Sequence, residues 1–179
     1  AENVDQCIES VRVVMERLGS QMFYEHIFVD NASTDGTLEK LVAARKLDSR
    51  IRVFRNGRNI GVHASFQRVI AEAKCEVVVP ILARGQIPPE VIPRLIESSD
   101  GLRRSVVAVR DGSERSRTRK SANAVFYSIL SRFSTPKIPK NFIGAGLFLG
   151  PQLQSLKAST APEPFLRGIV LGPESDLPF

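Results

Sequence analysis

The stretch Tyr24-Glu-His-Ile-Phe-Val-Asp30, followed by Asn31-Ala-Ser-Thr-Asp-Gly36, decides how this sequence folds. Its first half has the aromatic and β-branched residues of a strand, and its second half has the small polar residues of a turn. A helix is predicted to follow from Thr37 to about Lys46, capped by Thr34 or Asp35. A strand, a turn and a helix in this order predict one unit of an α/β sheet.

The alternation of strands and helices continues on both sides of this unit. Apolar residues at helical spacing predict a first helix that ends near Gly19: Val4, Ile8, Val11, Val14, Met15 and Leu18. Further strands are predicted at 51–54, 76–82 and 105–110, and further helices at 62–73, 88–98, 120–133, 153–157 and 165–170. The run at 76–82 is almost wholly apolar, which is typical of a central strand covered on both faces. We therefore predict a three-layer αβα sandwich with a mostly parallel sheet, in which the four strands lie side by side.

The composition is that of one ordinary folded domain spanning residues 1–179. Apolar residues make up 42% and charged residues 25% of the chain, which excludes a disordered protein. The longest apolar runs, such as 77–83, fall far short of the ~20 residues of a membrane helix. Cys7 and Cys75 form neither a disulfide framework nor a zinc-binding pattern, and the first residues lack the features of a signal peptide. The expected setting is the reducing cytoplasm.

Positive charge is concentrated in one segment. The chain has 25 Lys and Arg against 19 Asp and Glu, a net charge of +6, and residues 101–140 hold ten of these cations beside Asp111 and Glu114. Such a cluster favours contact with the phosphates of a nucleotide, a nucleic acid or an anionic lipid, and a solvated basic loop is the alternative. The chain has no Trp, and Phe126 and Tyr127 fall on a predicted helix. Because stacking residues are not interleaved with the cations, we expect no nucleic acid partner.

The predicted topology groups several polar residues along one edge of the sheet. Ligands of parallel α/β sheets bind outside the carboxyl ends of the strands. Asp30, the polar loop 55–61, the turn 82–87 and Arg110 all follow such strand ends. The sequence therefore predicts a binding site at this edge.

The segment 24–37 resembles the second-strand motif of family 2 glycosyltransferases, and four later segments resemble motifs of that family in the same order. They are Arg58-Asn-Ile-Gly61, Gln86-Ile-Pro-Pro-Glu90, Asn141-Phe-Ile-Gly-Ala-Gly-Leu-Phe148 and Glu163-Pro-Phe-Leu-Arg-Gly168. Within the family, the sequence is most similar to the polyprenyl-phosphate (dolichol-phosphate type) sugar synthases. The resemblance implies a GT-A fold and transfer of a sugar from a nucleoside-diphosphate sugar to an acceptor such as polyprenyl phosphate. It also implies a role in cell-envelope polysaccharide and a peripheral location at the inner face of the membrane.

The resemblance further assigns site residues. It implies that the nucleotide sugar is bound by Asp30, Arg58, Asn59, Gly61, Arg84 and Gln86, and that phosphate groups are bound by Arg110, Arg119, Lys120 and Arg167. It assigns no catalytic residue, and a phosphate acceptor is already ionised at neutral pH and needs no strong base. Two plainer roles stay open, because Asp30 can bond the turn that follows it and Arg58 can belong to an ordinary charged loop. His63 is expected to be a surface residue at a helix start.

The sequence departs from the family at the metal-binding motif. Family members hold Mg²⁺ or Mn²⁺ with Asp-x-Asp just before the Gln-x-Pro-Pro-Glu stretch, and here Leu82 and Arg84 occupy those two positions. Leucine has no ligand atom and a guanidinium repels a cation, whereas hard cations need oxygen ligands. We therefore expect no metal cofactor. Either Arg84 supplies positive charge to the diphosphate in place of the metal, or the site has decayed.

Two further departures concern the family's opening strand and its membrane helices, which have no counterpart here. The expectation is therefore a fragment of a longer protein, with an unpaired edge beside the strand 24–30 that favours a homodimer. Transfer activity is expected to be impaired, as in a pseudoenzyme. The alternative is a non-catalytic module that binds anionic membrane or nucleic acid through its basic segment 103–140.

Overall fold

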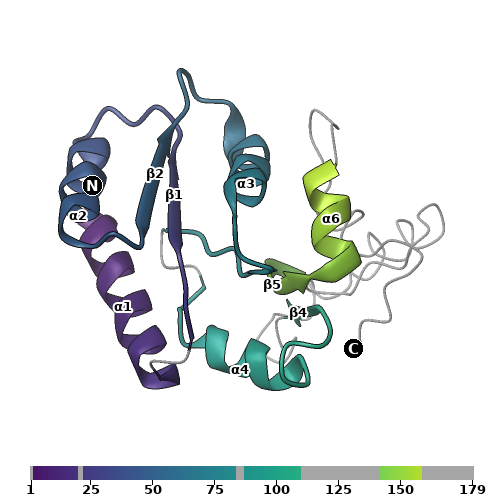
Figure 1. Cartoon of the computed structure of the whole chain (residues 1–179). Coiled ribbons are helices and arrows are strands. Elements are labelled where there is room, and N and C mark those ends of the chain that lie inside the picture. Colours follow the sequence, from purple (N-terminus) through teal and green to yellow (C-terminus); the bar gives the residue numbers. More distant parts are fainter. Residues whose placement is uncertain (1, 20–21, 84–86, 110–141, 159–179) are drawn as a thin grey trace, which may run out of the picture.

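Helices and strands alternate over residues 2–109, which confirms the predicted α/β class (Figure 1). The structure, a computed structural model, describes residues 2–19, 22–83, 87–109 and 142–158. In chain order the elements are α1 (Glu2–Leu18), β1 (His26–Asp30), α2 (Thr37–Leu47), β2 (Ile51–Arg55), α3 (Gly61–Glu72), β3 (Val77–Val78), α4 (Val91–Ser98), β4 (Val106–Val109), β5 (Phe142–Leu149) and α6 (Gly150–Ala158).

β1 and β2 form a parallel pair with helices on both faces. Five residues of each strand are in register, from His26 opposite Ile51 to Asp30 opposite Arg55. Figure 1 shows α1 and α2 on one side of the pair and α3 on the other. Neighbouring side chains of a strand point to opposite faces. Accordingly, Phe28 is buried with α1 and α2, while Ile27 packs against the core that α3 shares with α6.

A second sheet, in the order β3-β5-β4, is antiparallel throughout its described residues. β5 is its central strand, and it contributes two of the most deeply buried side chains of the described residues, Leu147 and Phe148. Phe148 joins α3 and α6 in one core, and Leu147 joins α4 and β4 in another. A side chain at Gly146 would start 2.7 Å from both the Phe148 ring and the carbonyl oxygen of Val106, so only glycine fits there.

Most of the predicted elements are present close to their expected bounds. The first helix ends at Leu18, and Gly19 follows it with a left-handed backbone. At the start of α2 the N-cap residue is Gly36, which makes no side-chain cap, so the predicted cap through Thr34 or Asp35 is wrong. Asp35 instead accepts hydrogen bonds from the N–H and the hydroxyl of Thr37. The parallel arrangement is confirmed in β1 and β2. The predicted helices at 120–133 and 165–170 lie outside the described residues.

Two predictions about the strands are wrong. The expected central strand 76–82 is reduced to Val77–Val78, an edge strand that pairs with Leu149 and Phe148 of β5. Pro80 has no N–H to donate, so the ladder cannot continue through it. The strands near 76–82 and 105–110 are also not neighbours, because β5 lies between them. The apolar run of β5 is long enough to form the central strand that the sequence pattern predicts at 76–82.

Glu25, just before β1, connects the parallel pair to the chain that leads into the second sheet. One carboxylate oxygen accepts a hydrogen bond from Arg52 at 2.5 Å, and the other accepts the N–H groups of Lys74 and Cys75 at 2.6 and 3.0 Å. Arg52 also donates to the carbonyl of Glu72 at 2.7 Å. Burial alone would raise the pKa of Glu25, but these hydrogen bonds outweigh it and lower the pKa.

The outer edge of β1 has no ladder partner among the described strands, since β1 pairs only with β2. Within the same residues, no helix combines the length and the apolar character needed to cross a membrane.

The tight environment of Gly146 makes it a test of the second sheet. We expect Gly146→Ala to lower the free energy of unfolding by about 1–3 kcal/mol, because the added methyl group overpacks against backbone. Thermal unfolding measures the change. Gly57→Ala is the matched control, because a Cβ at Gly57 meets nothing within 4 Å. Equal melting temperatures for the two variants would contradict the packing described for β5.

A second prediction concerns acid. Burial lowers the pKa of His26 to about 4, and the centroid of its ring lies 4.2 Å from the centroid of the Phe28 ring. The unfolded chain therefore binds a proton near pH 6.5 that the folded chain takes up only near pH 4. The free energy of unfolding is therefore unaffected by protonation of His26 above pH 6.5. It falls as the pH drops from 6.5 toward 4, by at most about 3 kcal/mol. We expect His26→Phe to lose less stability than the parent between pH 8 and pH 4.5 in urea titrations; equal losses would argue against this effect.

Candidate functional site

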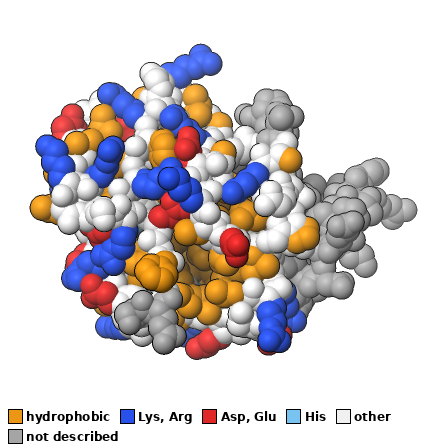
Figure 2. Space-filling model, viewed as in Figure 1, with side chains coloured by type: hydrophobic (Ala, Val, Ile, Leu, Met, Phe, Trp, Pro, Cys, Tyr) orange, Lys and Arg blue, Asp and Glu red, His pale blue; other side chains and the backbone are white. Residues whose placement is uncertain are grey.

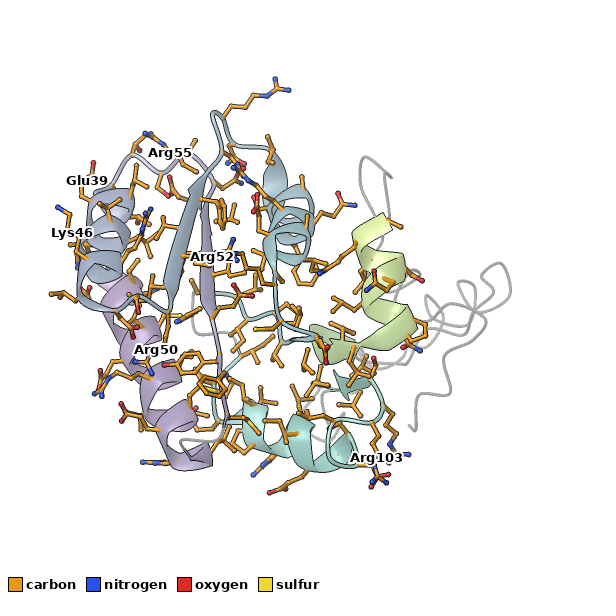
Figure 3. All side chains as sticks on the ribbon, viewed as in Figure 1. Glu39, Lys46, Arg50, Arg52, Arg55 and Arg103 are labelled. Atoms are coloured by element: carbon orange, nitrogen blue, oxygen red, sulfur yellow. The ribbon has the colours of Figure 1, made fainter. Side chains whose placement is uncertain are left out.

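The candidate site lies where β1 and β2 end, at the edge that the topology predicts. Asp30 and Arg55, the last residues of the two strands, are Cα partners in the parallel register. The turn 31–36 and the loop 56–60 therefore leave the sheet next to each other (Figure 1). Figure 3 shows Arg55 at this edge, with Arg52 and then Arg50 progressively nearer the other end of β2.

Asp30 has a fully buried side chain that bonds the turn following it. Both carboxylate oxygens accept the N–H of Ser33, at 3.2 and 3.3 Å, and Nε of Arg55 lies 3.6 Å from one of them. The carbonyl of Asp30 accepts the N–H of Asn56 at 2.8 Å, which extends the ladder beyond β2. These contacts are those of the plainer role foreseen for Asp30. A contact with a nucleotide stays a prediction.

Three asparagine side chains join the turn to the loop. The side-chain oxygen of Asn31 accepts the N–H of Ile60 at 3.0 Å and the amide nitrogen of Asn56 at 3.1 Å. Its side-chain nitrogen donates to the side-chain oxygen of Asn59 at 2.7 Å, and that oxygen also accepts the N–H of Gly61 at 3.0 Å. Beyond the backbone hydrogen bond of Asn56, the loop is therefore fixed to the end of β1 by side-chain amides.

α3 holds the loop from its other side. Ser65 accepts a hydrogen bond from Asn56, and Arg68 donates both to the Asn56 side-chain oxygen, at 2.5 Å, and to the carbonyl of Arg55, at 2.7 Å. Asn56 itself is 3% exposed, so its amide is satisfied entirely within the protein. The guanidinium of Arg68 also lies near the Phe54 ring, which keeps it against β2.

Asn56, Ser65 and Arg68 are not predicted as site residues from the sequence, although Asn56 falls within the loop 55–61 expected at this edge. A signal for two of them exists, because Ser65 and Arg68 are three positions apart and therefore share a helix face. Of the predicted residues, the structure brings Asp30, Asn59 and Gly61 to one edge, and Arg58 is exposed in the loop beside them. The other six lie outside the described residues: Arg84, Gln86, Arg110, Arg119, Lys120 and Arg167.

The donor set does not fit the metal that the family uses. Leu82 is described, and its apolar side chain is 38% exposed where an oxygen ligand would be needed. Within residues 2–19, 22–83, 87–109 and 142–158, no three His, Cys, Asp or Glu side chains come together as a metal site would require. We therefore assign no step to a metal ion.

A cavity of about 460 Å³ lies at the opposite end of the β1/β2 pair, next to the residues that precede the two strands. Its lining consists of Met15, Glu16, Gly19, Met22, Phe23, Tyr24 and Arg50. Figure 2 shows apolar side chains gathered around a hollow on the viewed face. The charged lining residues are already paired, Glu16 with Arg12 and Arg50 with Asp48. The cavity thus offers no unpaired charge to a phosphate, and the site is assigned to the strand ends.

The buried amide of Asn56 provides a test of this loop architecture. Asn56→Leu removes the oxygen that accepts from Arg68 and the nitrogen that donates to Asn31. We expect it to lower the free energy of unfolding by about 1–3 kcal/mol. The exposed Asn3 of α1 serves as the control through Asn3→Leu. Urea unfolding measures both variants. A loss of stability no greater than the control's would show that the network does not hold the loop.

Comparisons with known proteins agree with the resemblance carried by the motifs. Residues 1–149 match the sequence model of the family described as Glycosyl transferase family 2. Similar relatives are the undecaprenyl-phosphate 4-deoxy-4-formamido-L-arabinose transferases of Salmonella paratyphi B and Salmonella newport, each 30% identical over 132 residues. The matched region is 73% of this chain and 40% of each relative, so the chain aligns with less than half the length of these proteins. Together with the α/β fold and its parallel strand pair, the match shows that this chain belongs to glycosyl transferase family 2.

Proposed function

We propose that this chain forms the donor-binding part of a glycosyltransferase that moves a sugar from a nucleoside diphosphate to a polyprenyl phosphate. The observation that carries the proposal is the meeting of the turn 31–36 and the loop 56–60 at the carboxyl edge of a parallel strand pair. This is the edge at which open α/β sheets bind nucleotides. The similar Salmonella proteins, named as undecaprenyl-phosphate transferases, support the choice of acceptor.

In the proposed reaction, a phosphate oxygen of the acceptor attacks the anomeric carbon of the sugar. The bond from that carbon to the diphosphate oxygen breaks, and the nucleoside diphosphate leaves with the bonding electrons. The acceptor is already ionised at neutral pH, so the chain needs no strong general base. What the chain must supply is orientation of the donor and positive charge near the departing diphosphate.

Within this proposal, Arg58, Asn59 and Gly61 line the nucleotide pocket, and Asp30 shapes the turn beside it. Arg58 is exposed and lies between residues that the amide network fixes. Arg84 and Gln86 would face the diphosphate, and Arg110, Arg119, Lys120 and Arg167 would bind phosphate groups of donor and acceptor. Since Leu82 stands where the family has a metal ligand, we propose donor binding without a metal ion and slow turnover. The acceptor also implies work at a membrane surface.

Nucleotide titration tests this proposal. We expect isothermal calorimetry with UDP, GDP and CDP to detect selective binding of one of them, with an affinity that EDTA does not change. Arg58→Gln should weaken that binding by about tenfold, because a charge-assisted hydrogen bond to phosphate is lost. Arg45→Gln, an exposed change in the last turn of α2, is the matched control. Arg84→Ala should also weaken binding if Arg84 supplies the positive charge.

The outcomes separate the proposal from its alternatives. Loss of binding on addition of EDTA would show that a metal site exists after all. A folded parent that binds none of the nucleotides, but binds vesicles of anionic lipid, would favour the non-catalytic module that uses the basic segment 103–140. Equal affinities for Arg58→Gln and Arg45→Gln would remove the loop from the site.

A further inference from the structure

The amide groups at the strand ends have only one consistent orientation. Two backbone N–H groups fix it, because a backbone N–H can only donate. Ile60 N–H donates to Asn31, so that end of the Asn31 amide is its oxygen, and its nitrogen must face Asn59. Gly61 N–H donates to Asn59, so the atom that faces Asn31 is the Asn59 oxygen.

Asn56 is oriented in the same way from the helix side. Arg68 carries only donors, so the Asn56 atom at 2.5 Å from it is the oxygen. The Asn56 nitrogen then donates to the Asn31 oxygen and to Ser65. A continuous series of hydrogen bonds thus runs from Arg68 through Asn56 and Asn31 to Asn59 and the first N–H of α3. We call this series the amide relay.

An aspartate cannot replace Asn31 in the relay. At position 31, a carboxylate would still accept from Ile60, but it has no proton to donate to Asn59. Two oxygens would then face each other at the 2.7 Å now spanned by a hydrogen bond. If the Asn59 amide turned over to donate, the N–H of Gly61 would lose its acceptor.

We propose that Asn31, Asn56 and Arg68 are positioning residues for nucleotide binding, and that they act by holding Asn59 and Gly61 through this relay. The proposal rests on the proposed function, since it assumes that the loop 56–61 binds the nucleotide. It extends the site to residues that touch the loop from the sheet and from α3. It also explains why position 31 carries an amide, because its nitrogen must donate to the side-chain oxygen of Asn59.

The test compares Asn31→Asp with Asn3→Asp, which adds the same charge on the exposed face of α1. One measurement is hydrogen exchange of the Gly61 N–H by NMR without ligand, and the other is calorimetric titration of whichever of UDP, GDP and CDP the parent binds. For Asn31→Asp we expect Gly61 exchange at least tenfold faster and affinity about tenfold weaker, with the melting temperature of the control. A third variant carries Asn59→Ala alone, and a fourth carries Asn59→Ala together with Asn31→Asp. We expect these two variants to bind the nucleotide with equal affinity.

Each result decides the proposal. Unchanged Gly61 exchange in Asn31→Asp would overturn it, as would independent, additive effects of Asn31→Asp and Asn59→Ala on affinity. A parent that binds none of the nucleotides would contradict the proposed function, while Gly61 exchange would still show whether the relay holds the loop. Should Asn31→Asp fail to fold, Arg68→Met tests the relay from α3, because it removes the donor to Asn56 and keeps an apolar stem near Phe54.

Discussion

The parallel register of β1 and β2 is the constraint on which the rest of this structure depends. Because Asp30 lies opposite Arg55, both strands end at the same level, and the chain must leave them through two adjacent connections. Parallel strands cannot be joined by a tight hairpin, so each connection leads into a helix. The polar residues between strand and helix are therefore gathered at one edge by the backbone topology, before any side chain makes a contact.

The two ends of this strand pair are secured by different chemistry. At the amino end, the charged pair of Glu25 and Arg52 binds backbone groups of Glu72, Lys74 and Cys75, so the start of β1 is fixed to the chain between α3 and β3. At the carboxyl end, neutral amides connect Asn31, Asn56 and Asn59.

The sequence predicts the first half of the fold well, because that half depends on local patterns. The strand, turn and helix at 26–47 follow from residue types that act within a few positions. The second sheet depends on long-range pairing: β5 reaches β3 and β4 from the far end of the described chain, and no local pattern distinguishes an apolar central strand from an apolar edge. The apolar pattern therefore assigns to 76–82 the central position that β5 occupies, although Pro80 argues against a ladder through that run.

The candidate site also combines features that local patterns predict with features that depend on long-range packing. Topology alone indicated Asp30 and the loop, since strand ends follow from the strand pattern. Asn56 and Arg68 could not be found that way, because their roles depend on how α3 packs against the sheet. For Asp30, the resemblance implies a nucleotide contact and the turn is the plainer alternative; the structure shows both carboxylate oxygens bonded to the N–H of Ser33.

We propose that the edge formed by the ends of β1 and β2 binds a nucleotide. The most direct measurement is an NMR map of backbone amide shifts during addition of UDP, GDP or CDP to the intact chain. We expect the largest shifts on residues 30–33 and 56–61, with little change around the cavity at Met15, Met22 and Arg50. Shifts confined to that cavity, or no shift at the strand ends with any of the three nucleotides, would contradict it.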